Sequence, residues 1–180
     1  NFPLRNRYIL LDVSILSKLD AKSGIQRVVR NAVWGILSNR NLNYSVKLVA
    51  FENNKFVLKN TFEGKMKSLL DSFDPGIDNI FIDEDYLPIR GDIFIGLDLN
   101  HALYRNNFLA VNNLYVAGVK FINIVYDILP LKSRKNFEKN MPWFHKIWLD
   151  AILSFGDVIS ISKTTSNDLK DFISSNGIFL

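Results

Sequence analysis

Three polar residues follow directly after a short apolar run in the middle of the sequence. The run is Ile93–Leu97, and Asp98, Asn100 and His101 come after it. A carboxylate, an amide and an imidazole at the end of a strand can hydrogen-bond the hydroxyls of a sugar and so position a ligand. The same residues also suit a turn followed by a helix cap, and both interpretations stay open.

A second acidic residue, Asp127, follows the apolar run Val119–Val125 and the single residue Tyr126. Its carboxylate could accept a hydrogen bond from a sugar hydroxyl. It could equally cap a turn before Pro130. The sequence does not choose between these two roles.

A glycine lies at the predicted start of a helix, where Ser23, Gly24 and Gln26 match a capping box. The free amides and the dipole of a helix start attract phosphate, and a glycine lets a ligand approach the backbone closely. Arg27 and Arg30 could neutralise part of an anion's charge. A plain helix cap explains the same residues, because the sequence has neither a GxGxxG motif nor a Walker loop here.

The groups that several other chemistries need are missing from the sequence. There is no cysteine, which excludes disulfides, thiolate catalysis and zinc–thiolate sites. Only two histidines are present, so a multi-histidine metal site is not expected. No Ser–His–Asp set and no convincing carboxylate pair stands out. A thiolate or multi-histidine metal site is therefore not expected.

An alternation of strands and helices must position these candidate residues. Helices are predicted over residues 25–36, 102–117, 135–155 and 165–174, the first from apolar residues that recur on one helical face. The core strands between them are predicted at Tyr8–Val13, Ile93–Leu97, Val119–Val125 and Val158–Ile161. Such alternation implies right-handed crossovers, so the predicted class is α/β, with a Rossmann-like, doubly wound, mainly parallel sheet.

Glycines and one possible hairpin mark the joints of this pattern. Gly118, Gly156 and Gly177 each follow a predicted helix and precede a strand, where a left-handed glycine can end the helix. Tyr44–Ala50 alternates apolar and polar residues as a strand does, and Lys55–Lys59 can pair with it. In open parallel sheets ligands bind beyond the carboxyl ends of the strands, which is where the candidate residues stand.

Length and composition indicate one globular domain over residues 1–180, with 48% hydrophobic and 22% charged residues. The net charge of +4 comes from 22 basic residues scattered among 18 acidic ones, so nucleic acid is not an expected partner. A mild positive charge suits an anionic small ligand or an anionic membrane surface. No apolar run reaches the roughly 18 residues of a membrane span.

Several short motifs in a fixed order resemble the N-terminal domain of family-4 glycosyltransferases of the GT-B fold, especially bacterial enzymes of surface-polysaccharide synthesis. The resemblance covers nearly the whole chain. Its motifs are Asp12-Val13-Ser14, residues 23–29 (SGIQRVV), residues 91–98 (GDIFIGLD), residues 125–131 (VYDILPL) and residues 159–165 (ISISKTT).

This resemblance implies a retaining, nucleotide-sugar-dependent glycosyltransferase of the hexosyltransferase type that builds a surface polysaccharide or a glycolipid. It also implies that neither a metal nor a bound cofactor is needed. Ser23, Gly24 and Arg27 would lie in the loop near the donor diphosphate. Tyr126 and Asp127 would be the catalytic pair, with Tyr126 where many relatives have a histidine. Asp98, Asn100 and His101 would face the acceptor or a sugar.

The resemblance also implies partners and a setting. Such enzymes have two Rossmann-like domains, and the donor-binding C-terminal domain is absent from this sequence, so we expect this chain alone to be inactive. The expected partners are a nucleotide-sugar donor, a glycan or lipid-linked glycan acceptor and the missing domain. The expected location is the cytoplasm, with peripheral contact at the inner face of the membrane as an open alternative.

Two other functions fit the same architecture. One is a stand-alone Rossmann-like module that binds a nucleotide or a sugar without catalysis. The other is a flavodoxin-like regulatory domain, which Asp12, Asp127 and Lys163 imitate loosely as acidic residues and a lysine at strand ends. A phosphate loop directly after the first strand, which a flavodoxin needs, is absent.

Overall fold

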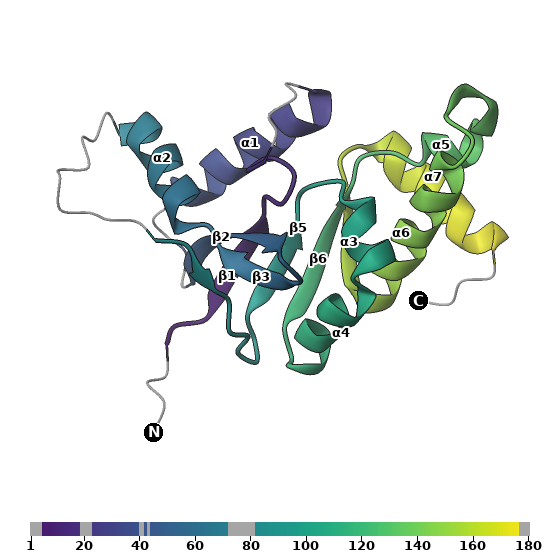
Figure 1. The fold of residues 1–180 in the computed structure, drawn as a ribbon. Coiled ribbons are helices and arrows are strands. Elements are labelled where there is room, and N and C mark those ends of the chain that lie inside the picture. Colours follow the sequence, from purple (N-terminus) through teal and green to yellow (C-terminus); the bar gives the residue numbers. More distant parts are fainter. Residues whose placement is uncertain (1–4, 19–22, 40–41, 43, 72–81, 177–180) are drawn as a thin grey trace.

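The computed structural model describes residues 5–18, 23–39, 42, 44–71 and 82–176. Within these ranges the strands are β1 Tyr8–Asp12, β2 Ser45–Glu52, β3 Lys55–Leu58, β4 Glu84–Asp85, β5 Ile93–Gly96, β6 Lys120–Val125 and β7 Gly156–Ser160. They form one sheet with the order β4-β3-β2-β1-β5-β6-β7 (Figure 1). All neighbours from β2 to β7 in this order are parallel, whereas β3 is antiparallel to both of its neighbours. The predicted doubly wound, mainly parallel α/β sheet is confirmed.

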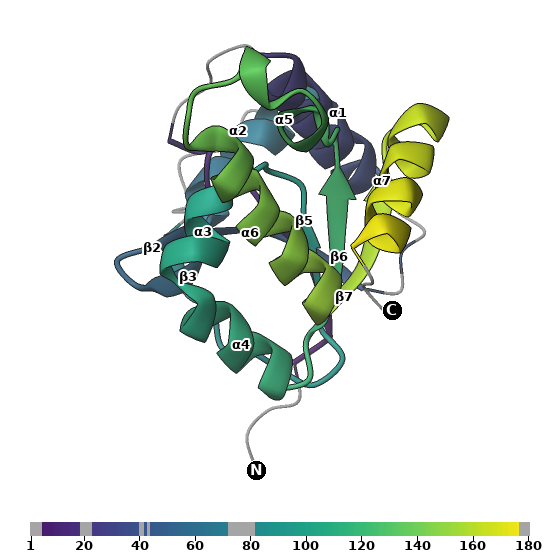
Figure 2. The ribbon, with the colours of Figure 1, turned by 90° about the vertical axis from the view of Figure 1, so that its right-hand side faces the viewer.

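Helices cover both faces of this sheet. They are α1 Gly24–Leu37, α2 Asn60–Asp71, α3 His101–Asn106, α4 Phe108–Val116, α5 Leu129–Lys132, the 3-10 helix η1 Arg134–Asn136, α6 Met141–Phe155 and α7 Lys163–Ser175. Figure 1 shows α1 and α2 on one side of the strands, and Figure 2 looks onto the other side, which α3, α4 and α6 cover. Right-handed crossovers require this division, because the chain winds from β1 towards β2 in one direction and from β5 towards β7 in the other.

The central strands are apolar on both sides, which explains their continuous apolar runs. Leu10 packs with the residues of α3, α4 and α6, and its neighbour Leu11 packs with those of α1. Leu48 and Val49 divide between the two faces in the same way. All four are fully buried, since successive side chains of a strand point to opposite faces.

The helix predicted over residues 102–117 is in fact two helices, so that prediction is wrong in its continuity. Asn107 separates α3 from α4 with φ −128° and ψ 29°, which are not helical values. Asparagine competes with helical hydrogen bonding through its short polar side chain, and Asn106 and Asn107 are adjacent here. The break lets Leu103 and Tyr104 on α3 and Val111 on α4 all be buried.

The helix predicted from residue 135 starts later than expected, at Met141. Residues 134–136 form η1 instead, and Pro142 occupies the first turn of α6. Proline lacks an amide hydrogen and clashes with the preceding turn, so it is tolerated at a helix start but not inside a helix. The position of Pro142 in the sequence could have given this boundary.

Of the three glycines predicted to end helices in the left-handed conformation, only Gly118 is shown to do so, with φ +87°. Gly156 has an extended φ of 171° and opens β7, so the prediction for it is wrong. A Cβ at Gly156 would collide with the carbonyl oxygen of Phe121, which is why the position needs glycine. Gly177 lies outside the described residues.

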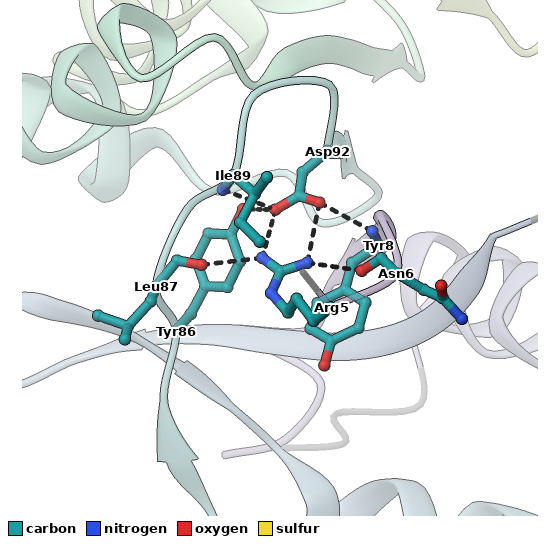
Figure 3. A network of polar contacts seen from close by, with 7 residues as sticks. All are labelled: Arg5, Asn6, Tyr8, Tyr86, Leu87, Ile89 and Asp92. Carbon is teal, nitrogen blue, oxygen red and sulfur yellow. Dashed lines mark hydrogen bonds and ion pairs between the residues drawn. The ribbon is translucent and has the colours of Figure 1, made fainter. Parts of the chain in front are cut away.

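A partly buried ion pair joins the strands where they begin, at what we call the amino end of the sheet. The carboxylate of Asp92, just before β5, accepts two hydrogen bonds from the guanidinium of Arg5 at 2.6 and 3.0 Å (Figure 3). It also accepts from the Tyr86 hydroxyl at 2.6 Å and from the amides of Tyr8 and Ile89 at 2.8 and 3.0 Å. Burial alone would raise the pKa of Asp92, but these donors lower it below its ordinary value.

Candidate functional site

The opposite end of the sheet, which we call the carboxyl end, is where β1, β5, β6 and β7 finish. The connection after β1 leads to β2 on one side, whereas β5, on the other side of β1, leads away towards β6. The junction of β1 and β5 is therefore the point at which the strand order diverges, where open α/β sheets bind their ligands. The candidate residues Asp98, Asn100, His101, Tyr126 and Asp127 all follow β5 or β6 at this end.

Asp98 connects the end of β5 to the loop that follows β1. Its Oδ2 atom accepts hydrogen bonds from the amides of Ile15 and Leu16 at 2.8 and 3.2 Å. The residue is buried, and burial raises the pKa of its carboxyl although the two amides act in the opposite direction. Oδ1 has no hydrogen-bond partner among the described residues, so one oxygen of this carboxylate stays available.

Asp12, the last residue of β1, is a second buried acid beside Asp98 that the sequence reasoning did not select for this site. Its Oδ1 accepts from the amide and the hydroxyl of Ser14, and the same hydroxyl accepts from the amide of Phe51 in β2. Burial, and then the charge of Asp98, raise the pKa of Asp12 to about 7. Its place at the end of a predicted strand was the signal that could have identified it.

The predicted phosphate-binding start of α1 is formed as expected at its cap. The side chain of Ser23 accepts a hydrogen bond from the Gln26 amide, and the amides of Gly24 and Ile25 have no acceptor among the described residues. A Cβ built at Gly24 would meet no heavy atom within 4 Å, and the backbone there is not left-handed. The fold therefore does not require glycine at this position. Arg27 is exposed in the first turn.

Tyr126 and Asn100 direct their polar groups into the protein. The Tyr126 hydroxyl donates to the carbonyl oxygen of Leu97 at 2.6 Å, and burial raises the pKa of this phenol. The side chain of Asn100 accepts from the amide of Leu103 and caps α3. Both side chains link the ends of β5 and β6 to their surroundings.

Asp127 and His101 are brought together through His145, a residue of α6. The carboxylate of Asp127 accepts from the Leu129 amide, which forms the turn that the sequence allowed, while its carbonyl oxygen lies 3.1 Å from Nε2 of His145. Nδ1 of His145 lies 3.0 Å from Nε2 of His101. No local pattern predicts this pairing, because the two histidines are 44 positions apart and meet only where α3 packs on α6.

Comparison with curated proteins matches almost the whole chain to bacterial enzymes. Two proteins of Escherichia coli, each named serotype-specific mannosyltransferase WbdA, are 29% identical to it over 98% of its length. A third of the same name is 30% identical over 94%. The chain is similar to bacterial mannosyltransferases. It spans about a fifth of the length of these relatives. This similarity confirms the relationship to bacterial glycosyltransferases that the motifs predicted.

No family model matches the chain, and no solved structure matches it significantly. In the parts of the chain that the structure describes, no helix is both long and apolar enough to cross a membrane. Those parts also contain no cluster of three or more metal-ligating side chains.

Proposed function

We propose that this chain is the acceptor-side, N-terminal domain of a retaining glycosyltransferase that transfers a mannosyl group from a nucleotide donor to a growing bacterial surface glycan. The observation that carries the proposal is the similarity of 98% of the chain to serotype-specific mannosyltransferases. The doubly wound sheet, with its polar carboxyl end, is the architecture that such a domain would use.

In the proposed reaction the bond between the anomeric carbon and the donor diphosphate breaks, and a new bond forms to an acceptor hydroxyl oxygen. The nucleoside diphosphate leaves with the negative charge, and the hydroxyl proton is released. Stabilisation of the leaving diphosphate is then the main electrostatic task, and no metal is required if amides and basic side chains perform it.

The start of α1 suits the diphosphate. The amides of Gly24 and Ile25 are free among the described residues, the dipole of a 14-residue helix favours an anion there, and Arg27 is exposed in the first turn. No heavy atom lies within 4 Å of a Cβ built at Gly24, so the helix start is open at this residue. The remaining donor contacts would come from a second domain, so this chain alone is expected to bind a nucleotide-sugar weakly and to transfer nothing.

The sugar side of the site is proposed to consist of hydrogen-bond acceptors. Oδ1 of Asp98 and the second oxygen of Asp127 have no partner among the described residues, and a sugar hydroxyl is a natural donor to both. In this proposal Asp127 orients the reacting sugar. Tyr126 and Asn100 hold the strand ends in place, because the hydroxyl of Tyr126 and the side-chain oxygen of Asn100 are already bonded within the protein.

The acceptor would be a glycan or a lipid-linked glycan, and the domain would work in the cytoplasm at or near the inner face of the membrane. The exposed apolar residues of α4, Leu109 and Val116, are each 76% exposed and are compatible with such a surface. Contact with the membrane remains part of the proposal.

Replacing Gly24 in the full-length enzyme tests the proposal. Gly24→Val should lower kcat/KM for transfer from a nucleotide-mannose by at least about 100-fold, because the side chain would occupy the space through which a diphosphate reaches the amides. Gly35→Val is the matched control, since Gly35 lies in the same helix, is exposed, and also has no heavy atom within 4 Å of a built Cβ. Thermal unfolding of both variants reports whether the fold is kept.

Three outcomes separate the possible functions. Loss of transfer in Gly24→Val with a normal control supports the diphosphate site. Equal activity in both variants would show that Gly24 is only a helix start. Absence of transfer in the unmodified full-length protein, combined with micromolar binding of a nucleotide-sugar by this chain alone, would favour a stand-alone binding module.

A further inference from the structure

The histidine pair at the carboxyl end of the sheet has no role in the donor and sugar contacts proposed so far. His101 is the first residue of α3 and is half-buried, whereas His145 on α6 is only 2% exposed. Nε2 of His101 and Nδ1 of His145 are 3.0 Å apart. The ring of Trp148 packs against both imidazoles, with centroid distances of 5.7 and 5.0 Å, so the two rings are held in place.

The two histidines and the carbonyl oxygen of Asp127 form a chain of hydrogen bonds, and the carbonyl oxygen fixes the direction of both bonds. The carbonyl oxygen of Asp127 can only accept, so Nε2 of His145 must carry the hydrogen of their 3.1 Å bond. In a neutral imidazole the other nitrogen is then an acceptor, and Nδ1 of His145 receives the Nε2 hydrogen of His101. His101 is therefore left with an unprotonated Nδ1.

Both rings are neutral at physiological pH. Burial, then the neighbouring His145 and Arg105, lower the pKa of His101 to about 4. Burial also lowers the pKa of His145, although Asp127 acts in the opposite direction. Arg105 on α3 and Asp127 after β6 are the charged groups that act on the pair, and Trp148 on α6 contributes no charge.

One nitrogen of His101 is left free for a ligand. His101 is half-buried, and its Nδ1 has no hydrogen-bond partner among the described residues. Nδ1 is therefore an unused hydrogen-bond acceptor on a ring that is held in place. An imidazole with so low a pKa is a weak base, so it is suited to hold a hydroxyl rather than to remove its proton.

We propose that His145 is a positioning residue that fixes His101 in the tautomer with Nδ1 unprotonated, so that His101 accepts a hydrogen bond from a hydroxyl of the bound sugar. This inference rests on the proposed function for the identity of the ligand. The arrangement of the two histidines does not depend on it. A carbonyl oxygen, two imidazoles and a sugar hydroxyl would then form one continuous chain of hydrogen bonds.

The tautomer can be measured directly, because the chain contains only two histidines. Two-bond 15N–1H correlation spectra of the chain labelled with 15N-histidine should show His101 with Nδ1 unprotonated and Nε2 protonated at pH 7.5, above the ordinary pKa of both histidines. In His145→Phe, which keeps a ring but removes the acceptor, the two tautomers of His101 should mix. His145→Asn, whose amide oxygen can replace Nδ1, should restore the fixed tautomer. A protonated Nδ1 in the unmodified chain, or an unchanged tautomer in His145→Phe, would overturn the proposal.

The sugar contact has its own readout. Addition of methyl α-mannopyranoside should move the 15N shift of Nδ1 in the unmodified chain, and His145→Phe should weaken this binding about fivefold to tenfold, as expected for one hydrogen bond. In the full-length enzyme His101→Phe should raise KM for the acceptor by a similar factor and change kcat little. If the 15N chemical shift of Nδ1 stays constant while other resonances respond to the sugar, the proposed contact is wrong. Missing transfer activity with the expected tautomer and shift would reject the proposed function and leave this inference standing.

Discussion

Each end of the sheet contains a buried carboxylate, and the pKa of the two is shifted in opposite directions. At the amino end Asp92 is fully buried, pairs with Arg5 and accepts from three further donors, so its pKa is lowered. At the carboxyl end Asp12 is as deeply buried but accepts only from Ser14, and it forms no ion pair among the described residues. Its pKa is raised to about 7, first by burial and then by the charge of Asp98.

This difference separates a carboxylate that stabilises the folded state from one that does not. A buried acid with a full set of donors stabilises the folded state, whereas two neighbouring buried acids without an ion-paired cation oppose folding when they ionise. Proteins keep such unfavourable arrangements mainly where a ligand binds. The carboxyl end, where the candidate sugar acceptors lie, matches that expectation.

The largest expected effect comes from removing the acid of the amino end. Asp92→Ala removes the acceptor of the Tyr86 hydroxyl and of two backbone amides, and it leaves the Arg5 guanidinium with only the carbonyl oxygens of Asn6 and Leu87. We expect the free energy of unfolding to fall by about 3–5 kcal/mol, as for other broken buried pairs, measured by urea denaturation at pH 7. Asp85→Ala is the control, because its pair with Lys55 is about half exposed and should contribute less than about 1 kcal/mol. Similar losses in both variants would contradict the comparison.

The second prediction concerns Asp12 and the pH dependence of stability. Below pH 7 the folded state holds a proton on Asp12 that the unfolded state releases above about pH 4, so stability should fall as the pH rises through this window. Asp12→Asn does not titrate and its amide oxygen can still accept from Ser14. The variant should therefore gain on the unmodified protein by at most about 1.4 kcal/mol per pH unit between pH 4 and pH 7.

Urea denaturation of both proteins at half-unit steps from pH 4 to pH 8 measures this gain. The lowered pKa values of His101 and His145 act in the opposite direction, but both proteins contain these residues and their effect cancels in the difference. Parallel stability curves for the two proteins would show that Asp12 ionises normally and that the contrast between the two ends is smaller than proposed.

The smallest expected effect tests whether side chains are tightly packed at the carboxyl end of the sheet, where Asp12 and Asp98 have no ion-pair partner among the described residues. A Cβ at Gly96 would collide with Oδ1 of Asn123, which also accepts from the Tyr104 hydroxyl at 2.7 Å, and both partners are buried. Gly96→Ala should lower the free energy of unfolding by about 1–3 kcal/mol.

Gly35→Ala is the control for this substitution. Gly35 lies in α1 with nothing within 4 Å of a built Cβ, and alanine should stabilise the helix there by up to about 1 kcal/mol. Thermal and urea unfolding of the two variants give the comparison. A neutral Gly96→Ala would mean that Asn123 can move, and that packing at this end is looser than the structure indicates.

Local sequence signals were sufficient for most of the fold. The four predicted core strands are found within two residues of their expected ends, and Ser23 caps α1 as its spacing predicted. These features depend on apolar periodicity and on side-chain caps, which act between residues close in sequence. The break at Asn107 and the late start of α6 were missed because a long apolar pattern outweighed single asparagine and proline signals.

For the site, the sequence by itself determined which polar residues stand after the strands, since parallel strands place their carboxyl ends together. Only the tertiary structure decided where those side chains point. Asp98 turns one oxygen towards the loop after β1, and Tyr126 bonds to the end of β5. His145 lies on the apolar face of α6, and it is the partner of His101 because α6 packs on α3. The partner of each of these side chains lies far away in the sequence. A local sequence pattern contains no information about such a partner, so it cannot predict where the hydrogen bond points.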